Sequence, residues 1–121
     1  MNDRLFRDAG LSDKTTVPTI SAGEFRNAVH AGYDIAILDV RLPSEYAYCR
    51  IPSARLIPLQ ELESRLGELS RSQMTVVYCH LGARSARAVQ LLRAAGFDLV
   101  YNLHGGIDAW SLEVDPAVPR Y

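Results

Sequence analysis

Three residues whose types can do chemistry stand close together in the middle of this sequence: Cys79, Arg84 and Ser85. The apolar run 74–78 before them is typical of a buried strand, and the apolar spacing over 84–95 is typical of a helix. In open α/β sheets, ligands bind beyond the carboxyl ends of the strands, where the first turn of the next helix offers unpaired N–H groups. Such donors and nearby cations stabilise a thiolate, so the pattern predicts a nucleophilic cysteine at a strand-loop-helix connection.

The residues that follow Cys79 suit a loop that encloses an anion. Gly82 can adopt the positive φ of a tight loop because it has no Cβ. Arg84, five residues after Cys79, can direct its guanidinium back at an anion within the loop. Ser85 can cap the helix or add a hydrogen-bond donor. A simpler interpretation stays open, since a free cysteine at the end of a strand is commonly just a small buried apolar residue.

The elements that must position this loop alternate along the chain. Ser21 and Glu24 have the spacing of a capping box, which predicts a helix running to about His30. Nearly continuous apolar runs at 34–40 and 74–78 predict strands covered on both faces of a sheet. Other predicted elements are short strands at 55–57 and 99–101, a helix containing Leu62, Leu66 and Leu69, the helix from about Arg84 to Ala95, and a last helix anchored by Trp110. Alternating strands and helices predict an α/β fold with a mostly parallel sheet between helices.

Length and composition fit one domain. The 121 residues, 48% of them hydrophobic, should bury roughly two-thirds of the surface of the unfolded chain. Residues 1–16 are polar, which predicts a tail or the remnant of a linker, and residues 17–121 form the domain proper. A net charge of -1 draws the protein toward neither nucleic acid nor an anionic membrane. Two cysteines cannot form a disulfide framework, and no segment has the roughly 18 apolar residues of a membrane span, so a reducing, cytoplasmic setting is expected.

Five short motifs, in order from about Val17 to Tyr121, together resemble the rhodanese-like domain family. They are Asp39-Val40-Arg41, Glu45-Tyr46, Ile51-Pro52-Ser53-Ala54, the Cys79 loop with its Cys-x-x-Gly-x-Arg-Ser pattern, and Gly105-Gly106 followed by Trp110. Segment 102–110 and the ending Pro119-Arg120-Tyr121 look most like the C-terminal rhodanese domains of adenylyltransferase-sulfurtransferases in molybdopterin and thiamine synthesis. Where many relatives have Gly-His-Ile-Pro-Gly-Ala, this chain has Cys49-Arg50-Ile51-Pro52-Ser53-Ala54, so its backbone there must differ or tolerate the change.

The resemblance implies a rhodanese-like fold, a five-stranded, mostly parallel sheet flanked by helices on both faces. It also implies a sulfurtransferase in which Cys79 takes a sulfane sulfur from thiosulfate or a protein persulfide. Cys79 then holds this sulfur as a persulfide and passes it to a nucleophilic acceptor. The substrate anion would be held by the loop residues His80, Leu81, Gly82, Ala83, Arg84 and Ser85. No metal and no organic cofactor are implied, and a ubiquitin-like sulfur-carrier protein is a partner of such domains.

Residues outside the loop receive supporting interpretations. Asp39 and Arg41, at the carboxyl end of a central strand, are expected to brace the loop through hydrogen bonds rather than to react. The His80 side chain is expected to point to solvent at the mouth of the site. Cys49 could close a disulfide with Cys79 after oxidation, although packing is the simpler role.

Two other functions stay open at this point. A rhodanese fold can serve as a catalytically idle binding or regulatory module, although this chain keeps Cys79. A phosphatase or arsenate reductase uses the same pairing of cysteine and arginine, but similar cell-cycle phosphatases have a loop one residue longer, shaped around phosphate. Four residues separate Cys79 from Arg84, which favours sulfur over phosphate. The sequence identifies neither the physiological donor and acceptor nor the oligomeric state.

Overall fold

A five-stranded sheet forms the centre of the molecule. The computed structural model describes residues 16–121, so all but the last residue of the predicted tail lies outside the described residues. The strands are β1 (Thr19–Ile20), β2 (Ile35–Asp39), β3 (Arg55–Leu56), β4 (Met74–Tyr78) and β5 (Val100–Leu103). They lie in the order β1-β5-β4-β2-β3, and each neighbouring pair is parallel. The predicted α/β fold with a mostly parallel five-stranded sheet is confirmed.

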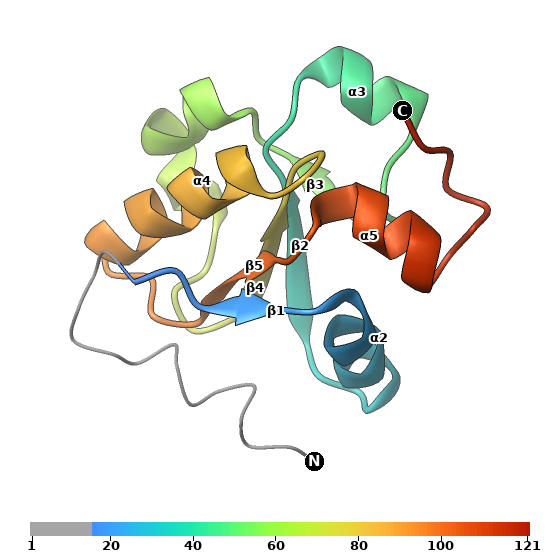
Figure 1. Ribbon diagram of the computed structural model, residues 1–121. Coiled ribbons are helices and arrows are strands. Elements are labelled where there is room, and N and C mark those ends of the chain that lie inside the picture. Colours follow the sequence, from blue (N-terminus) through green and yellow to red (C-terminus); the bar gives the residue numbers. More distant parts are fainter. Residues whose placement is uncertain (1–15) are drawn as a thin grey trace.

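Helices flank the sheet on both faces, as Figure 1 shows. They are α2 (Ala22–His30), α3 (Pro43–Tyr48), the 3-10 helix η1 (Leu59–Glu68), α4 (Ala83–Ala94) and α5 (Gly106–Glu113). Apolar residues of α2 and α5, such as Phe25 and Trp110, pack on one face of the sheet. Residues of α4 and η1, such as Leu62 and Leu92, pack on the other. None of the helices in the described part of the chain has the length and apolar character that crossing a bilayer requires.

Local signals account for most element boundaries. Ser21 Oγ accepts a hydrogen bond from the Glu24 amide (3.1 Å), and Glu24 Oε1 accepts one from the Ser21 amide (2.9 Å), which confirms the capping box. β4 has the predicted bounds, whereas β5 begins one residue later than expected and continues to Leu103. β1, with two residues, and α3, with six residues and none of them buried, carry no apolar period that could predict them.

The segment with Leu62, Leu66 and Leu69 differs from the expected helix. It is a 3-10 helix that ends before Leu69, and Arg65 within it has a non-helical backbone with φ -123°. A 3-10 helix aligns residues i and i+3, so Leu59 and Leu62 share one row toward the core. The break at Arg65 then lets Leu66 and Leu69 pack against the same apolar cluster.

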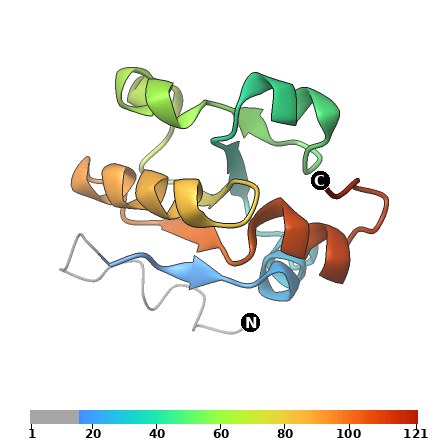
Figure 2. The ribbon, with the colours of Figure 1, turned by 45° about the horizontal axis from the view of Figure 1, so that its top comes forward.

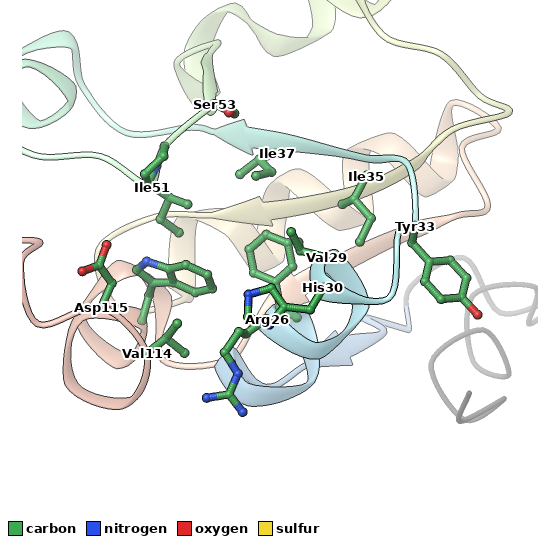
Figure 3. A pocket seen from close by; sticks show the side chains of 13 residues that line it. Arg26, Val29, His30, Tyr33, Ile35, Ile37, Ile51, Ser53, Val114 and Asp115 are labelled. Atoms are coloured by element: carbon green, nitrogen blue, oxygen red, sulfur yellow. The ribbon is translucent and has the colours of Figure 1, made fainter.

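β2 is less covered than its apolar sequence predicts. Its first three residues are only half-buried, whereas every residue of β4 is buried. A hollow of about 560 Å³ lies over this part of β2. Figure 3 shows Ile35 and Ile37 of β2 at this hollow, with Val29 and His30 contributed by α2. None of the residues 79–85 lines it, so this hollow is separate from the predicted loop.

Ser53 adopts a backbone conformation that normally selects glycine. Its φ is +70°, in the left-handed region. The chain therefore tolerates a serine in a left-handed turn. For a residue with a Cβ, this conformation costs roughly 1–2 kcal/mol.

We expect Ser53→Gly to raise the free energy of unfolding by about 0.5–1 kcal/mol, because the relief of strain exceeds the added entropy of the unfolded chain. Urea denaturation at neutral pH measures this change. The matched variant Ser64→Gly, in η1, should lower stability instead, since glycine weakens a helix. A loss of stability in Ser53→Gly would contradict the assignment of strain.

Candidate active site

Cys79 lies at the carboxyl end of β4, in the middle of the sheet, and is only 1% exposed. Its Sγ accepts hydrogen bonds from the amides of Gly82 (3.1 Å) and Ser85 (3.4 Å). Ser85 Oγ lies 3.3 Å from the same sulfur. Gly82 has φ +120°, which turns the loop so tightly that its amide faces back to the cysteine. Three polar groups therefore converge on one sulfur atom, an arrangement that stabilises a thiolate.

The Ser85 hydroxyl can adjust to the protonation state of this sulfur. Its Oγ lies 2.5 Å from Asn102 Oδ1 and 3.2 Å from the Gly82 carbonyl oxygen. A hydroxyl has one hydrogen and two lone pairs, so Ser85 Oγ can accept from a thiol while its hydrogen is donated to Asn102 Oδ1, and donation to a thiolate requires that hydrogen to turn away from Asn102. Asn102 Nδ2 also donates to the Gly82 carbonyl (3.2 Å), which holds the loop against β5. The sequence analysis did not identify Asn102 as a site residue, because its partner Ser85 is 17 residues away along the chain.

The first turn of α5 holds the loop from the other side. The Ile107 amide donates to the Cys79 carbonyl (3.0 Å), and the Asp108 amide donates to the His80 carbonyl (3.2 Å). Gly106 precedes them with φ +61°, and a Cβ on it would overlap the His80 carbonyl and lie 2.7 Å from the Cys79 carbonyl oxygen. The glycine therefore lets α5 approach the backbone of the candidate nucleophile.

Arg84 is paired with a carboxylate, which differs from the expected direction into the loop. Its two terminal nitrogens donate to Glu45 Oε1 (2.7 Å) and Oε2 (3.0 Å). This contact lowers the pKa of Glu45 to about 2, against the opposing effect of burial. Glu45 is the third residue of α3 and also accepts from the Leu42 amide (3.0 Å), which fixes the start of that helix. The motif Glu45-Tyr46 could be recognised in the sequence, but the sequence did not predict that Glu45 pairs with Arg84, 39 residues later.

Tyr121 connects a second ion pair to this one. Asp39 and Arg41 are fully buried and form a bidentate ion pair. Arg41 Nε donates to Asp39 Oδ1 (3.0 Å), and Arg41 Nη2 donates to Asp39 Oδ2 (2.7 Å). Arg41 donates to the Tyr121 hydroxyl (2.9 Å), which donates to Glu45 Oε2 (2.6 Å). Arg41 also donates to the Cys49 carbonyl (2.6 Å), and its bonds do not reach residues of the Cys79 loop. Any support of the loop by this pair is therefore indirect, through Tyr121 and Glu45 or through Tyr78, whose ring centroid lies 5.4 Å from the Arg41 guanidinium.

His80 does not point to solvent as the sequence suggested. Its ring stacks on that of Tyr121, with centroids 3.9 Å apart and an interplanar angle of 11°. Its Nε2 is buried and has no hydrogen-bond partner among the described residues. Figures 1 and 2 show the reason, since the chain after α5 returns toward α3 and brings its last residue there. In the same loop, the side chain of Leu81 is 62% exposed, and Ala83 is exposed as well.

Cys49 and Cys79 are both free thiols that belong to different apolar clusters. Cys49 packs with the cluster on the α2 and α5 side, and Cys79 with the cluster on the α4 side. Between residues 16 and 121, no group of three or more histidine, cysteine, aspartate or glutamate side chains is placed to hold a metal ion.

Comparison with known proteins decides the family. The sequence profile of the rhodanese-like domain matches residues 21–113. The chain belongs to the rhodanese-like domain family. It is 36% identical over 105 residues to the probable adenylyltransferase/sulfurtransferase MoeZ of Mycobacterium tuberculosis, which covers 85% of this chain and 27% of that protein. It is 38% identical over 85 residues to a sulfurtransferase of Allochromatium vinosum, which covers 70% of this chain and 79% of that one.

Solved structures agree with this assignment. A rhodanese-like domain protein from Staphylococcus aureus matches with a TM-score of 0.76 at 30% identity, over 87% of this chain and 99% of that one. The predicted family, and the likeness to adenylyltransferase-sulfurtransferases, are therefore confirmed. Because the chain spans about a quarter of the length of MoeZ, the likeness concerns the rhodanese domain. Relatives that are named sulfurtransferases associate this domain with sulfur transfer in general.

We expect Gly106→Ala to destabilise the protein by about 2–4 kcal/mol, because the new Cβ meets the two loop carbonyls at a positive φ. Thermal or urea unfolding measures the loss. Gly23→Ala in α2 is the matched control, since its Cβ meets no atom within 4 Å and should be neutral or stabilising. Equal effects at both positions would contradict the close approach of α5.

The Glu45–Arg84 pair predicts a pH-dependent contribution to stability. The pKa of Glu45 is lowered from 4.5 to about 2, so its contribution is present above pH 4.5 and is lost as the pH falls toward 2. We expect Glu45→Gln to lower the unfolding free energy at pH 7 on the order of 1–2 kcal/mol, allowing for solvent screening at the partly exposed Arg84. The difference from the unmodified protein should narrow between pH 5 and pH 3 in urea titrations. A difference that stays constant over this range would contradict the ion pair.

Proposed function

We propose that this protein is a sulfurtransferase that carries a sulfane sulfur as a persulfide on Cys79. The observation that carries the proposal is the convergence of the Gly82 and Ser85 amides and the Ser85 hydroxyl on one sulfur atom. The two backbone amides are fixed donors, so they can stabilise the thiolate before transfer and the persulfide after it without reorganising during the reaction. The family membership and the named sulfurtransferase relatives support this class of reaction.

The proposed reaction has two displacement steps. The Cys79 thiolate attacks the outer sulfur of thiosulfate or of a donor persulfide, and a new S–S bond forms. The S–S bond of the donor breaks, and sulfite or a thiolate leaves with the electron pair. A nucleophilic acceptor then attacks the outer sulfur of the persulfide, and the Cys79 thiolate leaves. The loop from His80 to Ser85 surrounds the sulfur that moves, and the electron pairs balance without a metal or an organic cofactor.

The setting and partners belong to the same proposal. The donor is a small sulfur-containing anion or a protein persulfide, and a ubiquitin-like sulfur-carrier protein is an acceptor. The name of the relative MoeZ, which joins an adenylyltransferase to a sulfurtransferase, supports such a carrier. The domain spans residues 17–121, and a reducing, cytoplasmic setting would keep the Cys79 thiol available.

Contacts around Arg84 favour sulfur transfer over phosphate chemistry. A phosphatase of this type needs its arginine for the phosphate, whereas both terminal nitrogens of Arg84 are bonded to Glu45. The hollow beside Cys79 has a volume of only about 190 Å³. The donors placed around the Cys79 sulfur also argue against a catalytically idle binding module, which would not need them.

Mass spectrometry of the intact, reduced protein tests the proposal. After incubation with thiosulfate, or with 2-hydroxyethyl persulfide, we expect a mass gain of about 32 Da, one sulfur atom. Cys79→Ser should lose this adduct, and Cys49→Ser should keep it. A folded protein that gains no sulfur from either donor would contradict the proposal and favour the binding module. Hydrolysis of p-nitrophenyl phosphate that depends on Cys79 would favour the phosphatase.

A further inference from the structure

The hollow beside Cys79 contains one guanidinium, and its charge is already balanced. The residues that line the hollow are Cys79, His80, Leu81, Ala83 and Arg84. A small dianion that enters the hollow depends on Arg84 for charge compensation, because it must approach a thiolate closely. Yet Glu45 bonds to Arg84 at 2.7 and 3.0 Å from outside the hollow. The pair as a whole offers little net attraction to an anion.

Tyr121 keeps Glu45 in this position. Its hydroxyl donates to Glu45 Oε2 at 2.6 Å and accepts from the buried Arg41 at 2.9 Å. Burial and the neighbouring carboxylate of Glu45 raise the pKa of Tyr121 to about 12, so the hydroxyl keeps its proton at neutral pH. The carboxylate is therefore fixed by donors on two sides, Arg84 and Tyr121, and has little freedom to release the guanidinium.

The rim of the site is apolar as well as neutral. Four of the six large apolar side chains that are exposed among residues 16–121 belong to residues of this region: Leu42, Tyr48, Leu81 and Tyr121. The Leu42 amide bonds to Glu45, and the Tyr48 ring meets the Tyr121 ring edge-on, with centroids 6.0 Å apart. Leu81 is part of the loop itself. Such a rim contacts uncharged carbon groups more favourably than a hydrated dianion.

We propose that Glu45, held by Tyr121, is a specificity-determining residue that neutralises Arg84 and selects persulfides on uncharged carbon groups over free dianions such as thiosulfate. This inference rests on the proposed persulfide chemistry at Cys79. In the favoured step, the Cys79 thiolate attacks the outer sulfur of R–S–SH. The bond between the two donor sulfurs breaks, R–S⁻ leaves with the electron pair, and Cys79 becomes the persulfide Cys–S–SH. The charge is one negative unit before and after the step, and no outside oxidant or reductant takes part.

The test compares kcat/KM for thiosulfate with kcat/KM for 2-hydroxyethyl persulfide, with cyanide as the common acceptor. We expect Glu45→Gln to raise the ratio of thiosulfate to persulfide by about tenfold, because it releases the charge of Arg84. The rise should shrink at high salt, since it comes from an uncompensated charge. Tyr121→Phe should shift the ratio in the same direction by about two- to threefold, and it tests the idea even if Glu45→Gln folds poorly.

Two further variants separate charge from structure. In the double variant Glu45→Gln/Arg84→Gln the rise in the ratio of thiosulfate to persulfide kcat/KM should disappear, because no guanidinium remains to be released. Glu61→Gln, which removes the carboxylate of an exposed pair with Arg65, should leave the ratio unchanged. An unchanged ratio in both Glu45→Gln and Tyr121→Phe, or a gain that survives in the double variant, would overturn the inference. Failure of the proposed function gives a different result, since the unmodified protein would then take sulfur from neither donor.

Discussion

The close contact between the first turn of α5 and the end of β4 is the constraint on which the rest of the site depends. The amides of Ile107 and Asp108 donate hydrogen bonds to the carbonyls of Cys79 and His80. Gly106, which has no Cβ, makes room for this approach. With these carbonyls fixed, the chain leaves the sheet in one direction, and the loop turns so that its own amides face the cysteine sulfur. The donors are then in place before any substrate binds, which is the condition for effective electrostatic stabilisation.

Electrostatics at the mouth of the site comes from three segments that are distant in sequence. The Asp39–Arg41 pair is fully buried, and such pairs seldom stabilise a fold because desolvation offsets their attraction. Here the pair also fixes the Cys49 carbonyl and the Tyr121 hydroxyl. Tyr121 in turn bonds Glu45, so the buried pair helps to set the position of the carboxylate that faces Arg84. A structural ion pair thereby affects the charge at the mouth of the candidate site.

Two of the concave regions at this sheet differ in size and in the residues that line them. The hollow beside Cys79 is small and lies at the carboxyl edge, where parallel strands place ligand sites. The hollow over β2 is larger, and none of the residues 79–85 lines it. It lies where α2 and α5 leave the start of β2 half-covered. Volume alone would favour the hollow over β2 as the functional site. The convergence of polar groups on the Cys79 sulfur favours the first region as the candidate active site.

The sequence alone was enough to predict the main elements of this protein and to point to the loop at Cys79 as the candidate site. Apolar runs and the capping box at Ser21 predicted the parallel sheet and the main helices, because each of these signals lies within a few residues. The order of five short motifs along the chain indicated the family and the loop at Cys79. Only the tertiary structure decided that Arg84 faces Glu45, that His80 lies under Tyr121, and that Asn102 holds Gly82. These contacts join residues 20 to 41 positions apart, and no local period records which side chains the packing of α3, α5 and β5 brings together.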